Sequence, residues 1–191
     1  MTEDAITKGL RALFLMIGED PDREGLRETP ARWLRAWGEW AQGYSEDPIA
    51  VLKTFEHSPA NEMVIVSNIP VVSTCEHHLA AIVGIAHVGY VPQGRIVGLS
   101  KLARVVDIFA RRLQVQERLT DQIADCVAQG LNALGVGVIV RARHHCMITR
   151  GVKAHQSLTT TSAMRGAMFD IPSARAEFIN LCRDAERDLN I

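Results

Sequence analysis

The chain has 191 residues, of which 47% are hydrophobic, enough for one domain with a full core or for one domain with an appendage. Its 21 Lys and Arg nearly balance its 22 Asp and Glu, and no block of cations stands out, so we expect no nucleic acid as a partner. The first residues are acidic and no apolar run is long enough to span a bilayer, which argues against a secretory signal and a membrane segment. We therefore expect a cytoplasmic protein whose four separated cysteines are free thiols or metal ligands.

The first sixty residues are expected to form a helical extension, followed by a main domain at residues 61–191. Apolar residues recur at helical spacing from Ile6 to Ile17, and Thr29-Pro30 predicts a second helix with Thr29 as its cap and Pro30 in its first position. Tryptophans follow on that helix at spacings of four and three, and this stripe is interpreted as packing, here against a partner subunit: Trp33, Trp37 and Trp40.

The main domain alternates between strand and helix patterns. Residues 63–69 and 82–91 are rich in β-branched side chains, which predicts two strands. A helix capped by Ser100 and a second helix that stops at Gly135 come next, and residues 136–148 and 157–169 predict two neighbouring antiparallel strands. Pro172 opens a last helix. This order predicts an α+β fold, an antiparallel sheet with a layer of two antiparallel helices on one face.

Two short segments carry metal-ligand residues. Cys75 and His78 have the spacing of a chelating pair in a tight turn or a first helical turn, with His77 pointing elsewhere. In the second segment, the two-residue period of a strand places His144 and Cys146 on one face. Each segment alone equally fits buried thiols and satisfied histidines. Together they favour a site with Cys75, His78 and Cys146 as ligands and a fourth position open for water, as in catalytic zinc sites.

The remaining cysteines and histidines are left out of this site. Cys126 and Cys182 fall in amphipathic helices without a neighbouring histidine, which predicts buried thiols. No spacing identifies a partner for the other histidines, so each is expected to be an ordinary surface or core residue: His57, His87 and His155.

Two further groups are candidates for contacts with a substrate. Lys101 and Arg104 lie in the first turn of a helix, where the helix dipole disfavours cations, so either an anion such as phosphate binds there or the face is simply solvated. Arg150 offers a forked donor to the same anion. Gln116-Glu117 opens the second helix, where a carboxylate is favoured by the dipole and is also suited to accept paired N–H groups from a base edge. Spacing does not choose between these alternatives, and no P-loop motif is present.

Five segments in register resemble GTP cyclohydrolase I: Ser73-Thr74-Cys75-Glu76-His77-His78, Gly98-Leu99-Ser100-Lys101, Gln114-Val115-Gln116-Glu117-Arg118-Leu119-Thr120, His144-His145-Cys146-Met147 and Arg150-Gly151-Val152. The resemblance covers about residues 63–169 and, more loosely, residues 28–32. Several long motifs in one order are far more specific than any short pattern. The resemblance implies the tunnelling fold (T-fold), with subunits joined into two stacked rings that form a homodecamer and with active sites between subunits.

The resemblance also implies the reaction. Water opens the imidazole ring of GTP at C8, formate leaves, and rearrangement gives 7,8-dihydroneopterin triphosphate, the first step of tetrahydrofolate and pterin biosynthesis. It implies Zn²⁺ on Cys75, His78 and Cys146, and proton transfer by His144 and His77. The resemblance also implies Glu117 and Gln116 at the guanine edge and Ser100 at the ribose end. At the triphosphate it implies Lys101, Arg104 and Arg150, together with Arg32 from a neighbouring subunit.

Two rival functions differ in what they require. A nitrile reductase on the same fold uses its cysteine as a covalent nucleophile without zinc, and the segment 144–146 argues against it. A non-catalytic binding protein with a structural metal does not need the proton-transfer and base-binding residues.

Overall fold

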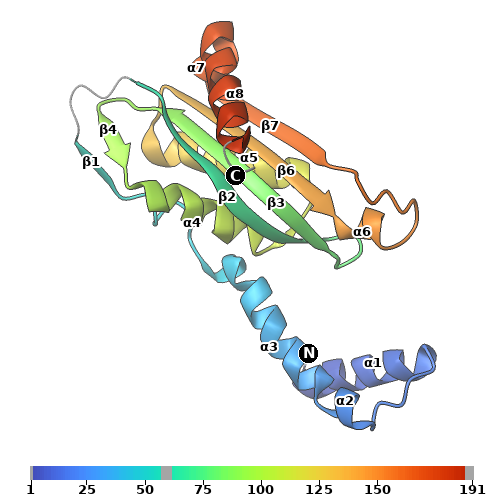
Figure 1. Cartoon of the computed structure of the whole chain (residues 1–191). Coiled ribbons are helices and arrows are strands. Elements are labelled where there is room, and N and C mark those ends of the chain that lie inside the picture. The colour runs from blue at the N-terminus through green and yellow to red at the C-terminus, as the bar shows by residue number, and fades with distance from the viewer. Residues whose placement is uncertain (1, 57–61, 188–191) are drawn as a thin grey trace. The chain divides into compact units, whose positions relative to one another are not determined.

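The computed structural model describes residues 2–56 and 62–187, and it divides into two compact units, Met1–Ala41 and Gln42–Ile191 (Figure 1). The predicted boundary between the helical extension and the main domain, at residues 60 and 61, lies outside the described residues. No helix in the described part of the chain combines the length and apolar character that a membrane crossing needs.

The first unit is helical, as predicted, with α1 (Glu3–Met16), α2 (Glu24–Arg27) and α3 (Thr29–Trp40). The tryptophan stripe packs on itself, with ring centroids 5.5 Å apart for Trp33 and Trp37 and 5.7 Å apart for Trp37 and Trp40. The predicted cap is wrong: Glu28 is the N-cap residue, because the Thr29 hydroxyl donates back to the Gly25 carbonyl of α2 at 3.3 Å. Pro30 is therefore the second helical residue.

The second unit confirms the α+β prediction. Its elements are η1 (Gln42–Ser45), β1 (Thr54–Glu56), β2 (Val64–Cys75), β3 (Ala81–Val91), β4 (Arg95–Val97), α4 (Leu99–Ala110), β5 (Leu113–Gln114), α5 (Gln116–Leu131), β6 (Gly135–His144), α6 (His145–Ile148), β7 (Thr159–Gly166), α7 (Ala167–Asp170) and α8 (Pro172–Arg187). The main sheet has the order β5-β2-β3-β6-β7, antiparallel throughout except for the short parallel pairing of β5 with β2. β1 and β4 form a separate antiparallel pair. This architecture is consistent with the T-fold.

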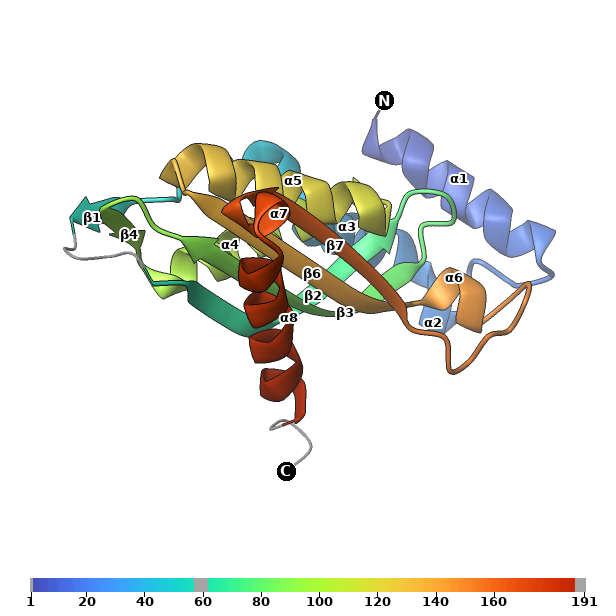
Figure 2. The same ribbon diagram turned by 90° about the horizontal axis from the view of Figure 1, so that it is seen from above.

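The main core lies between the sheet and helices α4 and α5, which cover one face (Figure 2). Alternate residues of each strand point into this core, for example Val71 in β2, Val88 in β3 and Val140 in β6, all fully buried. Leu102 of α4 and Leu119 of α5 are equally buried against them. Burying each such side chain contributes about 1.5–3 kcal/mol, so this layer is what holds the helices on the sheet.

Helix α8 crosses the opposite face of the sheet (Figure 2). Phe178 is fully buried there, over Gly89 and Gly137 of the two central strands. A Cβ atom on either glycine would lie 2.8 Å from the Phe178 ring, so the ring can reach the sheet only because both side chains are missing. Cys182 is buried in the same cluster, and burial raises the pKa of its thiol to about 12.

Several predicted boundaries in this unit are wrong. The strand predicted at residues 63–69 continues as β2 to Cys75. Gly98, not Ser100, is the N-cap of α4, which therefore begins at Leu99, two residues earlier than predicted. Helix α5 ends at Leu131, and its C-cap residue Asn132 is in the left-handed conformation (φ 47°), so Gly135 is free to begin β6. The strand predicted at 136–148 stops at His144, where the chain turns into α6. The strand predicted at 157–169 is shorter, and its end becomes α7.

Candidate metal centre and active site

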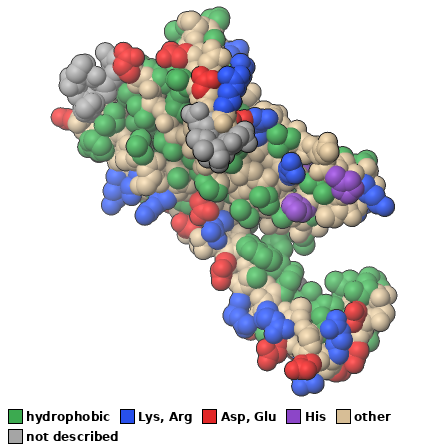
Figure 3. Space-filling model, viewed as in Figure 1, with side chains coloured by type: hydrophobic (Ala, Val, Ile, Leu, Met, Phe, Trp, Pro, Cys, Tyr) green, Lys and Arg blue, Asp and Glu red, His purple; other side chains and the backbone are tan. Residues whose placement is uncertain are grey.

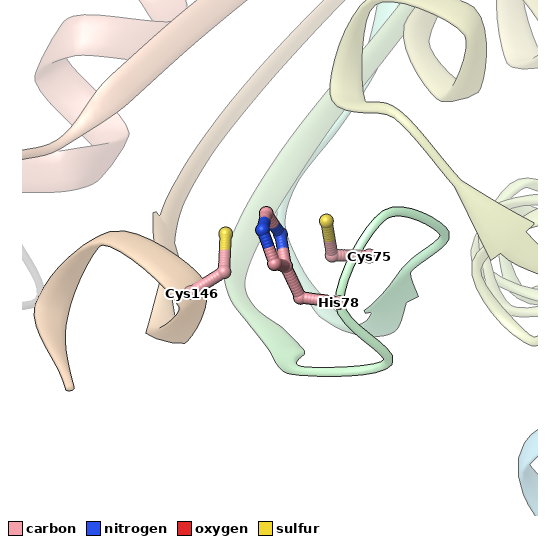
Figure 4. A group of neighbouring side chains, drawn as sticks. All are labelled: Cys75, His78 and Cys146. Atoms are coloured by element: carbon pink, nitrogen blue, oxygen red, sulfur yellow. The ribbon is translucent and has the colours of Figure 1, made fainter. Parts of the chain in front are cut away.

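The three candidate metal ligands, Cys75, His78 and Cys146, meet because of the strand order. Both β2 and β6 run antiparallel to β3, so their carboxyl ends lie at the same edge of the sheet. Thr74 pairs with Ala81 and His144 with Ile82, which places the two motif segments on either side of the start of β3. The ligand atoms of Cys75, His78 and Cys146 all lie within 4.8 Å of one another (Figure 4). On the face shown in Figure 3, histidine side chains gather at this end of the sheet.

The first two ligands come from the tight turn after β2. Cys75 donates its backbone N–H to Ala80 (2.8 Å), and Leu79 closes the turn by donating to the Cys75 carbonyl (2.8 Å) with a left-handed φ of 52°. This turn brings His78 back over Cys75, as its spacing of three suggests. His77 points elsewhere, with its ring centroid 6.3 Å from that of His78 and an interplanar angle of 85°.

The third ligand is placed by a helical turn. Cys146 lies on α6, so the strand argument that put it on one face with His144 is wrong for Cys146. The α6 turn carries the half-buried Cys146 side chain to Cys75, in a small apolar cluster with Ile82 and Ala142. Burial, and then the hydrogen bond with the Cys75 thiol, raise the pKa of the Cys146 thiol in the absence of a metal. Arg150 donates to His78 Nε2 at 3.1 Å, which puts a cation beside the same three residues.

A clamp that the sequence did not reveal holds the Cys75–His78 turn. The Glu76 backbone N–H donates to the Gln114 carbonyl of β5 (3.0 Å), and the Glu76 carboxylate accepts from Arg118 of α5. Arg118 also donates to the Gln114 side chain (3.1 Å) and to the Leu113 carbonyl (2.9 Å). The hydrogen bond from Arg118 holds the pKa of Glu76 below its usual range. Glu76 and Arg118 both lie within the motifs quoted in the sequence analysis. Their contact could not be predicted from spacing, because they are 42 residues apart.

His144 is held by the first turn of α5. It follows Val140 and Ala142 on the helix-facing side of β6, and its Nε2 lies 2.7 Å from Oε1 of Gln116. Burial lowers the pKa of His144, while the negative charge of Glu117 acts in the opposite direction. Gln116 is 1% exposed, whereas Glu117 is exposed.

The remaining predicted substrate contacts are exposed or half-buried side chains. Ser100 and Arg104 are exposed and Lys101 is half-buried, all on the first turns of α4. No hydrogen bond in the described part of the chain joins them to the metal ligands or to His144. In the first unit, Arg32 is exposed and donates to Glu28 (3.1 Å) and to the Gly25 carbonyl (3.2 Å).

Comparison with known proteins gives a consistent result over nearly the whole chain. A sequence model of the family GTP cyclohydrolase I matches residues 6–183. Proteins named GTP cyclohydrolase 1 from Janthinobacterium sp. (strain Marseille) and Mycolicibacterium vanbaalenii are 50% and 53% identical, covering 96% and 90% of this chain and 94% and 86% of their own. A third, from Dehalococcoides mccartyi (strain ATCC BAA-2266 / KCTC 15142 / 195), is 48% identical over 94% of this chain and 96% of its own.

Proposed function

The chain belongs to the GTP cyclohydrolase I family, and from that premise we propose that it is a zinc-dependent enzyme that converts GTP into 7,8-dihydroneopterin triphosphate and formate. The observation that carries the zinc dependence is the convergence of Cys75, His78 and Cys146, whose ligand atoms lie within 4.8 Å of one another. The family membership supports GTP cyclohydrolase activity.

The chemistry of the donor set fits zinc. Two thiolates and one imidazole suit this borderline-soft ion, and three protein ligands leave the fourth tetrahedral position open. When bound, zinc supplies a Lewis acid that lowers the pKa of water towards neutrality. Arg150 adds a nearby positive charge that favours the thiolate form of Cys146. The thiol protons must leave when the metal binds, so metal affinity rises with pH.

The chain's own residues supply proton transfer and substrate contacts. We assign proton transfer to His144, and to His77 on the turn that carries His78. Glu117, exposed at the start of α5, accepts N–H groups of the guanine edge, with Gln116 beside it in the chain. The triphosphate is assigned to Lys101, Arg104 and Arg150, with Ser100 at the ribose and Arg32 contributed by a neighbouring subunit.

The assignments to several subunits require an oligomer, for which we propose a homodecamer of two stacked rings in the cytoplasm. The edge position of β7 supports this proposal, because the described sheet ends there with backbone groups that a neighbouring sheet can pair.

The test is to incubate the purified protein with GTP, with and without a zinc chelator, and to measure formate release and the fluorescence of the oxidised pterin. We expect both products, and loss of both with chelator. Formate without pterin would mean that the reaction stops after ring opening. The absence of both products would contradict the proposal.

Matched cysteine variants separate metal binding from general damage. Cys146→Ala is expected to lose zinc and activity together. Cys126→Ala removes a buried thiol from the core between α5 and the sheet and is expected to keep both. An active, zinc-free Cys146→Ala protein would refute the metal assignment.

A further inference from the structure

The environment of Gln116 points to a role in the reaction different from contact with the base. We propose that Gln116 is a positioning residue that holds His144 as the tautomer with hydrogen on Nε2, so that Nδ1 is the ring nitrogen that exchanges protons during catalysis. The proposal deepens the function above, since it rests on His144 acting in proton transfer.

The orientation of the Gln116 amide is determined by its surroundings. Its Nε2 lies 3.0 Å from the Val140 carbonyl, 3.1 Å from the Thr159 carbonyl and 3.1 Å from Thr161 Oγ1. Backbone carbonyls only accept hydrogen bonds. Exchanging the amide nitrogen and oxygen would press Oε1 against two carbonyl oxygens in a site that is 1% exposed, where unpaired polar atoms are costly. The NH₂ group therefore faces strands β6 and β7.

The neighbouring hydroxyl groups agree with this orientation. Thr120 Oγ1 donates to the Gln116 backbone carbonyl at 2.7 Å, which uses its single proton. The 2.6 Å contact between Thr120 and Thr161 must then be donated by Thr161. This leaves a lone pair on Thr161 Oγ1 to accept from the Gln116 amide, whose two N–H groups are shared among this oxygen and the Val140 and Thr159 carbonyls.

The position of Oε1 decides the state of His144. Oε1 lies 2.7 Å from His144 Nε2, and an amide oxygen can only accept. Nε2 must therefore carry hydrogen, which in a neutral imidazole leaves the lone pair on Nδ1. The imidazolium also donates from Nε2, so the contact with Gln116 persists when a proton arrives at Nδ1 and when it leaves. Proton exchange at Nδ1 thus needs no rotation of the ring.

The same hydrogen bonds argue against direct contact between Gln116 and the substrate. Both N–H groups and the oxygen of its amide are already paired, and the side chain is buried. Glu117 on the same helical turn is exposed and remains the group suited to the guanine edge. The two adjacent residues therefore divide the work, with Glu117 for binding and Gln116 for holding the catalytic histidine.

The first test compares kinetics of Gln116→Met and Glu117→Gln in the zinc-loaded full chain. Gln116→Met keeps the size of the side chain without its hydrogen bonds, and we expect kcat to fall about 10- to 100-fold with KM for GTP and zinc content near wild type. Glu117→Gln is expected to raise KM instead. A Gln116→Met variant whose KM rises while kcat is unchanged would show direct substrate contact and overturn the proposal.

The second test does not depend on a Gln116 variant or on GTP turnover. Solid-state ¹⁵N spectra of zinc-loaded protein labelled at histidine, recorded at about pH 8 where the unperturbed imidazole is neutral, distinguish the two tautomers. The His144 signals are identified by their loss in His144→Asn. We expect hydrogen on Nε2; hydrogen on Nδ1 would overturn the positioning role. Wild-type protein that leaves GTP unchanged but shows the Nε2–H tautomer would contradict the proposed function instead.

Discussion

Replacing Arg118 by Met is expected to weaken zinc binding far more than folding. Arg118 donates to Glu76, to the Gln114 side chain and to the Leu113 carbonyl, and thereby ties α5 and β5 to the turn that carries Cys75 and His78. Methionine keeps much of the aliphatic stem and removes all of these bonds. The turn then loses its outer support while both ligands remain.

The structure indicates that the effect on zinc affinity is larger than the effect on folding stability. The side chains of Arg118 and Glu76 are 42% and 32% exposed, so solvent screens their attraction and its contribution to folding stability is small. Groups that orient metal ligands have a larger effect on the site, and their loss typically lowers metal affinity about 10- to 100-fold. We expect a decrease of this size in zinc affinity, with a urea midpoint close to that of the metal-free wild type.

Competition with a chromophoric chelator measures the zinc affinity, and urea unfolding of the metal-free protein measures stability. Arg95→Met is the matched control, because Arg95 donates to Thr54 Oγ1 (3.0 Å) and to the Thr54 carbonyl (3.1 Å) and pairs with Glu56, all on the separate β1–β4 sheet. It is expected to bind zinc normally. Zinc binding as tight as wild type in Arg118→Met, or an equal loss of affinity in Arg95→Met, would show that Arg118 does not support the metal site.

Three further predictions concern the core, the pH dependence and the substrate. Gly137→Ala places a Cβ 2.6 Å from Met168 Sδ and 2.8 Å from the Phe178 ring. It is expected to lower the free energy of unfolding, measured in urea, by about 1–3 kcal/mol. An unchanged urea midpoint would show that α8 can shift to make room for the methyl group at no cost. His87 is fully buried, and burial lowers its pKa although Glu186 of α8 raises it and Arg141 of β6 lowers it further. Because the unfolded chain then binds the proton first, stability should fall as the pH drops below about 6.5, by at most about 1.4 kcal/mol per pH unit. His87→Gln should flatten this slope in unfolding curves, and an equal slope in both proteins would exclude His87 as its source. Glu117→Ala should keep its zinc, measured by metal analysis, and lose GTP binding, measured by calorimetry; unchanged GTP affinity would remove Glu117 from the base-binding role.

Local patterns predicted the parts of the fold that depend on near neighbours. The β-branched runs gave β2 and β3, helical spacing gave α4 and α5, and their order gave the antiparallel sheet with helices on one face. Predictions of helix caps and helix ends were less accurate, because a single competing hydrogen bond can shift the boundary of a helix. The Thr29 hydroxyl has a carbonyl of the previous helix within reach, and Asn132 ends α5 before Gly135 is needed.

The candidate metal site was predicted from the sequence only in part. The spacing of Cys75 and His78 describes one tight turn, which is a local property, and the motif order identified the family. The strand period holds as far as His144, the last residue of β6, but failed for Cys146, whose position depends on where β6 ends and α6 begins. Cys146 does lie beside Cys75 and His78, but the α6 turn places it there and not the strand period.

By itself, then, the sequence determined the family, the α+β class and the three residues that form the candidate metal centre. Only the tertiary structure decided which residues support the Cys75–His78 turn and His144. Arg118 reaches Glu76 across 42 positions, and the Gln116 amide, which contacts His144, is enclosed by Val140, Thr159 and Thr161, 24 to 45 positions away. The physical reason is that hydrogen-bond partners of buried polar groups are set by strand order and register, which bring distant backbone carbonyls together. Residue spacing along the chain therefore does not predict these contacts.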